Sequence, residues 1–206
     1  DLEAGGTWLG IGANGRFAAL TNIREPHKPP SRRSRGELVS DFLSGNQSIG
    51  EYFADVGRRS VEYAGFNLLL GTADQLWHYN SQDVAPQLLD AGIYGLSNAG
   101  LDTPWPKLLK ARAALAEVLN DPQPQALLAL LSDRQTAPFS DLPDTGVGLA
   151  TESLLSSVFI SSPSYGTRAS TLIAIDHAGH GWISERRFGP EGVFEGETTL
   201  RIGPGA

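Results

Sequence analysis

Short apolar runs separated by turn-forming residues recur along the chain, and runs of this length favour β-strands. Residues 7–12 and 17–21 are two such runs, joined by Ala13-Asn14-Gly15. Because Asn-Gly tolerates the positive φ angles of tight hairpin turns, they predict a β-hairpin. Residues 66–71 and 76–79 predict a second hairpin with its turn at 72–74, and residues 93–96 predict a further strand.

The clearest β pattern lies at the end of the chain. Residues 170–176, 181–188 and 194–202 are three apolar runs with turns at 177–179 and 189–192. They predict a three-stranded meander, and the last four residues, 203–206, predict a disordered tail. Since the expected strands come in hairpin pairs and not singly between helices, we expect mainly antiparallel sheets.

Two helix starts carry the Ser-x-x-Glu pattern of a capping box, in which serine and glutamate satisfy free backbone N–H groups reciprocally. The first pattern, Ser34 to Glu37, predicts a helix over residues 34–43, and the second, Ser48 to Glu51, predicts one over residues 48–61. Their apolar positions recur at helical spacing and should be buried: Leu38, Val39, Phe42, Tyr52, Phe53 and Val56.

Further helices are expected in the second half of the chain. Asp102-Thr103-Pro104 predicts a helix start, because proline is tolerated in the first helical turn, and the apolar stripe after it extends to residue 119. Residues 125–131 predict a short Leu-rich helix, and residues 152–159 a short helix or strand, of which we favour the helix. The polar segment 132–147 predicts a surface loop. The whole pattern predicts an α+β fold, with residues 1–206 in a single domain.

The net charge of the chain limits the classes of partner that it can bind. The formal net charge is −7 and the pI is about 5.0, which argues against nucleic acid, since a phosphate backbone requires a basic surface. One local exception is a basic cluster around Pro29 and Pro30: Lys28, Arg32, Arg33 and Arg35. This cluster could bind an anion, but we favour a solvated loop face for it.

The chain contains no cysteine, which excludes disulfides and thiolate metal sites within it. This fits a cytoplasmic protein. Its four histidines show no metal-binding spacing, so we expect no metal site, and no apolar stretch is long enough to span a bilayer. Methionine is also absent and the chain begins at Asp1, so we expect the natural N-terminus to lie upstream. The oligomeric state cannot be read from this sequence.

Three polar residues at strand ends are candidates for chemistry. Asn22 follows the second expected strand and Asn98 follows residues 93–96. A carboxamide there can donate to a developing oxyanion, although a turn residue bonded to its own backbone is the simpler interpretation of each. Arg168 opens the final meander, where a guanidinium can hold a carboxylate or form a structural ion pair. No serine, threonine or histidine in the chain is arranged as a nucleophile with its base.

Seven co-linear segments resemble the NRDE family, also called the transport and Golgi organisation protein 2 family. The resemblance extends from residue 4 to about residue 202. The segments are Ala4-Gly5-Gly6-Thr7-Trp8-Leu9-Gly10, Phe17-Ala18-Ala19-Leu20-Thr21-Asn22-Ile23-Arg24-Glu25-Pro26, Ser34-Arg35-Gly36-Glu37-Leu38-Val39, Tyr63-Ala64-Gly65-Phe66-Asn67-Leu68-Leu69, Leu96-Ser97-Asn98-Ala99, Thr103-Pro104-Trp105-Pro106-Lys107 and Tyr165-Gly166-Thr167-Arg168-Ala169-Ser170-Thr171.

The resemblance implies an N-terminal-nucleophile (Ntn) hydrolase-like fold, a four-layer αββα sandwich of mainly antiparallel sheets. Enzymes of the related cholylglycine hydrolase and penicillin V acylase branch use an N-terminal cysteine with an Arg/Asp pair, two asparagines and a later arginine. By position, Asn22 and Asn98 resemble the two asparagines and Arg168 the later arginine. The strand that carries the family's cysteine and Asn-Arg-Asp-Glu motif does not occur in this sequence, so we expect the first strand or strands of the fold to be missing from it.

Two functions follow from the resemblance, and we favour the first. One is the binding or trafficking of haem or a related amphipathic, carboxylate-bearing ligand, with Trp8, Arg24 and Trp105 as expected ligand contacts and no other cofactor required. The alternative is an amidohydrolase that cleaves C–N amide bonds, with Asn22 and Asn98 in supporting roles and its cysteine upstream of this chain. A third possibility is a scaffold protein that has kept the fold and lost the catalytic activity.

Overall fold

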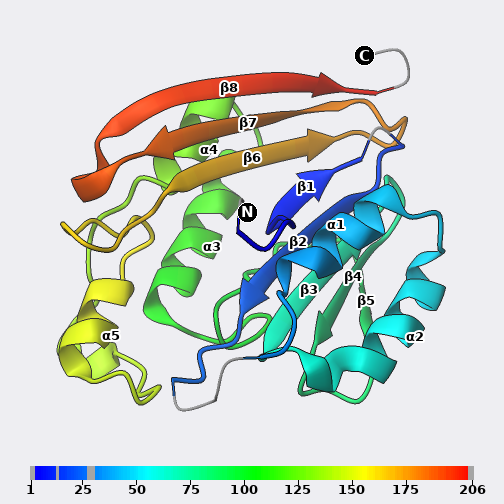
Figure 1. Ribbon diagram of the computed structural model, residues 1–206. Helices are drawn as coiled ribbons and strands as arrows, with labels where there is room; N and C mark the ends of the chain where they lie inside the picture. Colours follow the sequence, from blue (N-terminus) through cyan, green and yellow to red (C-terminus); the bar gives the residue numbers. More distant parts are fainter. Residues whose placement is uncertain (1–2, 13, 27–30, 204–206) are drawn as a thin grey trace.

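Two antiparallel sheets form the framework of the protein (Figure 1). The computed structural model describes residues 3–12, 14–26 and 31–203. The first sheet has the strand order β1-β2-β3-β4-β5 and the second the order β6-β7-β8. The strands are β1 Leu9–Ile11, β2 Phe17–Asn22, β3 Phe66–Gly71, β4 Leu76–Asn80, β5 Gln87–Leu89, β6 Ala169–Ile175, β7 Gly181–Phe188 and β8 Phe194–Ile202.

Five α-helices and three short 3-10 turns complete the elements of the described ranges. The helices are α1 Gly36–Ser44, α2 Ile49–Arg59, α3 Pro106–Val118, α4 Pro124–Leu130 and α5 Leu149–Leu155. The 3-10 turns are Ser60–Glu62, Phe139–Asp141 and Pro190–Gly192. Both expected hairpins, the C-terminal meander and the helices at 34–43, 48–61, 104–119 and 125–131 are confirmed within a few residues. The mixed α and β content with antiparallel sheets is therefore also confirmed.

The main core lies between the first sheet and the helices α1 and α2. Leu20 on β2, Leu68 on β3 and Tyr79 on β4 are directly opposite one another in the strand register, and all three are buried. The helices add the apolar residues that the sequence pattern indicated: Leu38, Val39, Phe42, Tyr52, Phe53 and Val56. Alternation thus gives this face of the sheet a continuous apolar surface, which α1 and α2 cover (Figure 1).

The second sheet lies between the first sheet and the helices α3 and α4 (Figure 1). On β6, Leu172 lines a cavity together with α3 and α4, whereas Ile173 and Ile175 line another together with Leu9 and Phe17 of the first sheet. Because consecutive residues of a strand point to opposite faces, the layers follow the order helices, sheet, sheet, helices. The opening between them at the strand ends holds the candidate site.

The strand prediction was wrong in two details. Residues 93–96 do not form a strand; the backbone of Gly95 bonds to Asp102, and Leu96 makes an isolated bridge with Leu101. This segment therefore closes a loop on itself. The fifth strand of the first sheet is instead β5, whose three residues, of which only Leu89 is buried, are too few to show an alternating β pattern.

The segment 132–147 is a loop with one 3-10 turn, as expected, and the expected helix at 152–159 is found earlier, as α5. Helix α5 stops at Leu155 because Ser156 bonds back to Ser153 and the chain then turns away. Three sequence predictions fall outside the described residues: the turn residue Ala13, the basic residue Lys28 and the tail 204–206. No helix in the described ranges is long and apolar enough to cross a membrane.

Of the two predicted capping boxes, only the second forms. The Ser48 hydroxyl accepts from the Glu51 backbone N–H, and the Glu51 carboxylate accepts from the Ser48 backbone N–H. In the first, Arg35 occupies the N-cap without a side-chain cap bond. The carboxylate of Glu37 forms an ion pair with Arg33 and accepts a bond from Tyr63, so it is not available to the helix end.

This difference gives a test. We expect Ser48→Ala to lower the free energy of unfolding by about 1 kcal/mol, because an N-cap bond is lost. Ser34→Ala should cost clearly less, since the Ser34 hydroxyl accepts only one long bond, 3.4 Å, from the Gly36 backbone N–H and takes no part in a capping box. Urea denaturation of the two variants measures both values, and equal losses would contradict this assignment of the caps.

Candidate functional site

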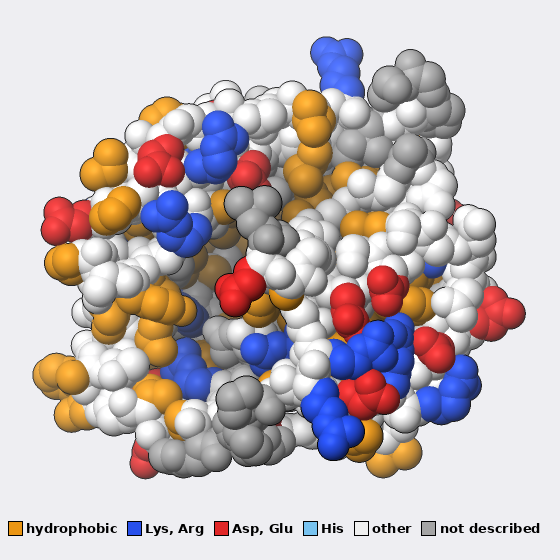
Figure 2. All heavy atoms as spheres, in the orientation of Figure 1, with side chains coloured by type: hydrophobic (Ala, Val, Ile, Leu, Met, Phe, Trp, Pro, Cys, Tyr) orange, Lys and Arg blue, Asp and Glu red, His pale blue; other side chains and the backbone are white. Residues whose placement is uncertain are grey.

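A basic pocket of about 710 Å³ opens where β2 ends, beside the loop that holds Asn98. Among the described residues, its lining includes five cationic side chains and a single acidic one, Glu25. Lys and Arg side chains gather around the hollow on this face in Figure 2. The cationic residues are Arg24, Arg32, Arg33, Arg35 and Lys107. In a chain of net charge −7, this concentrates positive charge at one place, which favours an anion.

The two candidate asparagines meet in this pocket. The Asn98 side-chain amide donates to the backbone oxygen of Asn22 at 2.8 Å, and the Arg24 backbone N–H donates to the backbone oxygen of Asn98 at 2.8 Å. The side-chain oxygen Oδ1 of Asn22 is buried and has no hydrogen-bond partner among the described residues. A buried acceptor without a partner costs about 1–3 kcal/mol, so this oxygen is suited to receive a donor from a ligand or a water molecule.

A polar row across the first sheet fixes the loop that carries Asn98. Thr21, Asn67 and Asn80 are opposite one another on β2, β3 and β4. Thr21 donates to the carbonyl of Ser97 at 3.0 Å, and Asn80 donates to the carbonyl of Ala99 at 3.4 Å. Asn67, which is fully buried, donates to both carbonyls. The residues on either side of Asn98 are therefore held to the sheet by three strands.

His78, two residues before Asn80 on β4, contacts this row through Asn67. Its Nε2 lies 3.2 Å from the side-chain oxygen of Asn67, and the ring is buried. Burial lowers the pKa of His78, opposed by the charge of Asp83, so the imidazole is neutral near pH 7 and can donate through Nε2. His78 thus fixes the orientation of the Asn67 amide and does not line the basic pocket.

The wall of the pocket near α5 is a buried ion pair. The Arg24 guanidinium contacts the Glu152 carboxylate at 2.7 Å, with the two side chains 13% and 3% exposed. The second oxygen of Glu152 accepts from the backbone N–H and the hydroxyl of Thr145. Arg24 also lies over the ring of Trp105, 4.8 Å from its centre. Two of the expected ligand contacts, Arg24 and Trp105, are therefore adjacent, and Glu152 holds Arg24 in place.

Lys107 is the most perturbed cation of the pocket. Its ammonium donates to the backbone oxygen of Leu155 at 2.9 Å. Burial, reinforced by the charge of Arg24 and opposed by Glu152, lowers the pKa of Lys107 to about 8. Lys107 is the second residue of α3, where the helix dipole disfavours positive charge. A bound anion would relieve each of these costs.

The remaining cations correct the sequence interpretation of the basic cluster. We favoured a solvated loop face, but Arg32, Arg33 and Arg35 all line the pocket. Arg33 is paired with Glu37 and Glu62. Arg35 donates to the backbone oxygen of Gly65 at 3.0 Å, and burial lowers its pKa, with the charge of Glu25 acting in the opposite direction. Among the described residues, Arg32, Arg35 and Lys107 line the pocket without an ion pair. Arg32 is exposed to solvent, so the half-buried Arg35 and Lys107 are the cations best placed to hold an external anion.

Trp105 contacts Arg24 but does not line the pocket, and two other expected residues also lie outside the lining. Trp8 is 44% exposed and stacks beside Arg35, with its ring centre 5.9 Å from the guanidinium. Arg168 is at the start of β6, with its side chain 66% exposed and 3.9 Å from Glu195. The structure thus brings Asn22, Asn98, Arg24 and Trp105 together. Arg168 instead lies beside Glu195, which agrees with the structural ion pair that the sequence offered as its alternative role.

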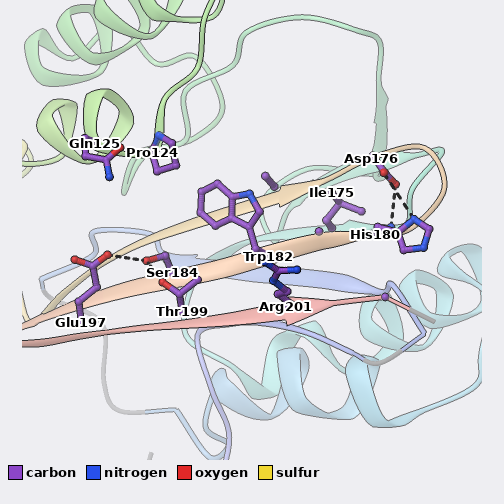
Figure 3. A pocket seen from close by; sticks show the side chains of 13 residues that line it. Pro124, Gln125, Ile175, Asp176, His180, Trp182, Ser184, Glu197, Thr199 and Arg201 are labelled. Carbon is purple, nitrogen blue, oxygen red and sulfur yellow. Dashed lines mark hydrogen bonds and ion pairs between the residues drawn. The ribbon is translucent and has the colours of Figure 1, made fainter. Parts of the chain in front are cut away.

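A larger hollow than the basic pocket lies against the α4 side of the second sheet and measures about 1010 Å³. In Figure 3, Trp182 lies on the side of the sheet that faces Pro124 and Gln125. The polar side chains that line this hollow contact one another: Ser184 donates to Glu197, and Asp176 is close to His180. None of the candidate residues lines it, and in the described ranges no group of three or more His, Cys, Asp or Glu side chains could hold a metal ion.

Sequence reasoning missed Lys107 and Glu152 as site residues. A lysine in the first turn of a helix is electrostatically unfavourable, and this was the available signal for Lys107. Glu152 carried no such signal, because only the tertiary fold shows that its side chain is buried against Arg24.

These features define an α+β protein of two antiparallel sheets with a basic, asparagine-containing pocket at the strand ends. Comparison with known proteins gives a more specific assignment. The sequence model of the family "Transport and Golgi organisation 2" matches residues 1–190, and the chain belongs to this family, which confirms the resemblance seen in the sequence.

Curated relatives agree with this assignment. The chain is 37% identical over 217 residues to the Transport and Golgi organization protein 2 homolog of Homo sapiens, covering 96% of this chain and 79% of that protein. It is 35% identical over 205 residues to the Transport and Golgi organization 2 homolog of Mus musculus and 36% identical over 209 residues to that of Bos taurus. Each alignment covers 90% of this chain and 74% of the relative.

Proposed function

We propose that this protein binds and carries a small carboxylate-bearing ligand, such as haem, in the basic pocket. The observation that supports this is the charge of the lining: five cations face one carboxylate in a chain that is acidic overall. A pocket of about 710 Å³ has the size that small-molecule sites commonly have, ~300–1,000 Å³. We propose the cytoplasm as its location.

The individual contacts support a carboxylate as the recognised group. Arg35 offers a planar fork of donors, which suits a carboxylate, and Lys107 offers a second positive charge across the pocket. Trp8, which is 44% exposed, stacks on Arg35 and can extend its ring along an apolar ligand body. Trp105 is buried and supports the site through its contact with Arg24. Since His78, His177 and His180 do not line the pocket, recognition of haem would rest on its carboxylates and not on its iron.

A second candidate function, cleavage of a C–N amide bond, is favoured by one observation. The buried and unpartnered Oδ1 of Asn22 can accept a hydrogen bond from a substrate amide N–H, beside Asn98 on the neighbouring loop. We propose that the layered arrangement is Ntn hydrolase-like, which would make these the supporting asparagines of such a site. The complete protein would then need an unblocked N-terminal cysteine. Mass spectrometry that finds this position blocked would exclude the mechanism.

The binding proposal is tested by titrating the full-length protein with haemin and following the Soret band. We expect saturable binding, and we expect Arg35→Glu to weaken it about tenfold to a hundredfold, because a hydrogen bond between charged groups contributes ~1.5–3 kcal/mol. Arg58→Glu is the matched control, since Arg58 lies on α2 with its side chain 71% exposed and outside the pocket.

Three results would count against the proposal: no saturable Soret change, unchanged affinity in Arg35→Glu, or an equal loss in both variants. Thermal melting of both variants separates a binding defect from unfolding. The conservative Arg35→Lys should recover part of the affinity, because it restores the charge without the planar fork.

A further inference from the structure

An apolar groove of about 380 Å³ lies next to the basic pocket, between α3, α4 and the strand β6. Aliphatic side chains from all three elements line it, among them Leu108, Leu115, Leu127, Leu131 and Leu172. Such a lining favours an apolar ligand part, since removal of apolar surface from water drives its burial.

The polar groups of the groove are already satisfied within the protein. Arg112 contacts the carboxylate of Asp102 at 2.9 Å, and the hydroxyl of Thr171 donates to Glu185 at 3.3 Å. A ligand that reaches into the groove therefore gains contacts with aliphatic carbon there and meets its charged partner at one end only.

That end is Lys107, which lines both the groove and the basic pocket. Its ammonium donates to the backbone oxygen of Leu155, a residue that lines the basic pocket, while its methylene chain is available to the groove. The loop that carries Asn98 also connects the two cavities, because Ser97 lines the groove and the next residue, Asn98, lines the pocket. The two cavities thus meet at two separate segments of the chain.

We propose that the groove holds the linear apolar tail of a monocarboxylate, of the fatty-acid type, whose head group lies at Lys107 in the basic pocket. The position of the head group rests on the proposed function; the groove as the tail site is the new element. Arg24 and Glu152 are the other charged groups that face Lys107, and Arg24 is already neutralised by Glu152. Lys107 is therefore the cation available where the pocket meets the groove, since Arg35 lines the pocket but not the groove.

The experiment is isothermal titration of the full-length protein with the saturated carboxylates from butanoate to dodecanoate. We expect the affinity to rise about fourfold per added methylene until the groove is filled, since burial of one methylene contributes ~0.8 kcal/mol. Ala111→Phe, which places a ring in the groove, should weaken dodecanoate at least about tenfold and leave butanoate unchanged. Ala116→Phe is the matched control, because Ala116 lies on the exposed side of the same helix.

The outcomes separate this inference from the proposed function. If carboxylates bind and Arg35→Glu weakens them, but chain length and Ala111→Phe have no effect, the groove is not the tail site and the basic pocket remains the anion site. If no carboxylate binds, including haemin, both proposals fail. Affinity should also fall as the pH rises above about 8, where Lys107 loses its proton, and Lys107→Gln should remove this pH dependence; an unchanged pH profile in that variant would place the head group elsewhere.

Discussion

Glu152→Ala is expected to lower the free energy of unfolding by about 3–5 kcal/mol, the usual cost of removing one partner from a buried ion pair. The carboxylate is 3% exposed and contacts Arg24 at 2.7 Å. Its removal leaves the Arg24 charge, 13% exposed, without a counter-charge, and it also removes the acceptor for the Thr145 backbone N–H. Chemical denaturation followed by tryptophan fluorescence measures the loss.

The matched control is Glu197→Ala, which removes the same side chain from an ion pair of similar length. Glu197 contacts Arg186 at 2.8 Å on the second sheet, but the two side chains are 36% and 31% exposed. Water can replace the lost contact there, so we expect a much smaller change. In the double variant Arg24→Met with Glu152→Leu, most of the loss should be recovered, since no buried charge remains. Equal losses in the two single variants would show that burial does not determine the effect.

Asn67→Leu is expected to cost about 3 kcal/mol and to release the loop that holds Asn98. Leucine has a similar volume but can neither donate to the carbonyls of Ser97 and Ala99 nor accept from His78. Each buried polar group left without a partner costs ~1–3 kcal/mol. The bonds from Thr21 to Ser97 and from Asn80 to Ala99 limit the loss, because each carbonyl keeps one donor.

Hydrogen exchange distinguishes loop release from a general loss of stability. The Arg24 backbone N–H donates to the carbonyl of Asn98, so its exchange should accelerate more than that of the Leu68 amide in the core of the same sheet. Uniform acceleration of both amides in Asn67→Leu would contradict a specific role of Asn67 in holding the loop.

Local patterns predicted most of the elements, for physical reasons that act over a few residues. The turn after residue 12 needs a positive φ, which Gly15 adopts at +74°, and Ser48 can reach the N–H of Glu51 because the two are one helical turn apart. The sequence predictions failed where a residue outside the local pattern bound a group that the predicted element needed. Glu37 is positioned like Glu51, but Arg33 and Tyr63 bind its carboxylate, and Gly95 bonds to Asp102 where a strand was expected.

The candidate site was predictable only in part. Asn22, Asn98, Arg24 and Trp105 were proposed from their sequence context and from the resemblance, and they meet in one region of the structure. Arg35 belonged to a cluster that composition alone assigned to solvent. Glu152 could not be predicted, because its role depends on Arg24, which lies 128 positions earlier in the chain.

The sequence by itself therefore determined the hairpins, the capped helices, the antiparallel α+β class and the family, since each depends on short-range geometry or on matched segments. Only the tertiary structure decided which charges gather and which are buried. The pocket joins the end of β2, the loop at Asn98 and the start of α3, and an electrostatic environment depends on distances in space. Residues that are far apart in the sequence, at strand ends and in loops, together line one basic pocket with an apolar groove beside it.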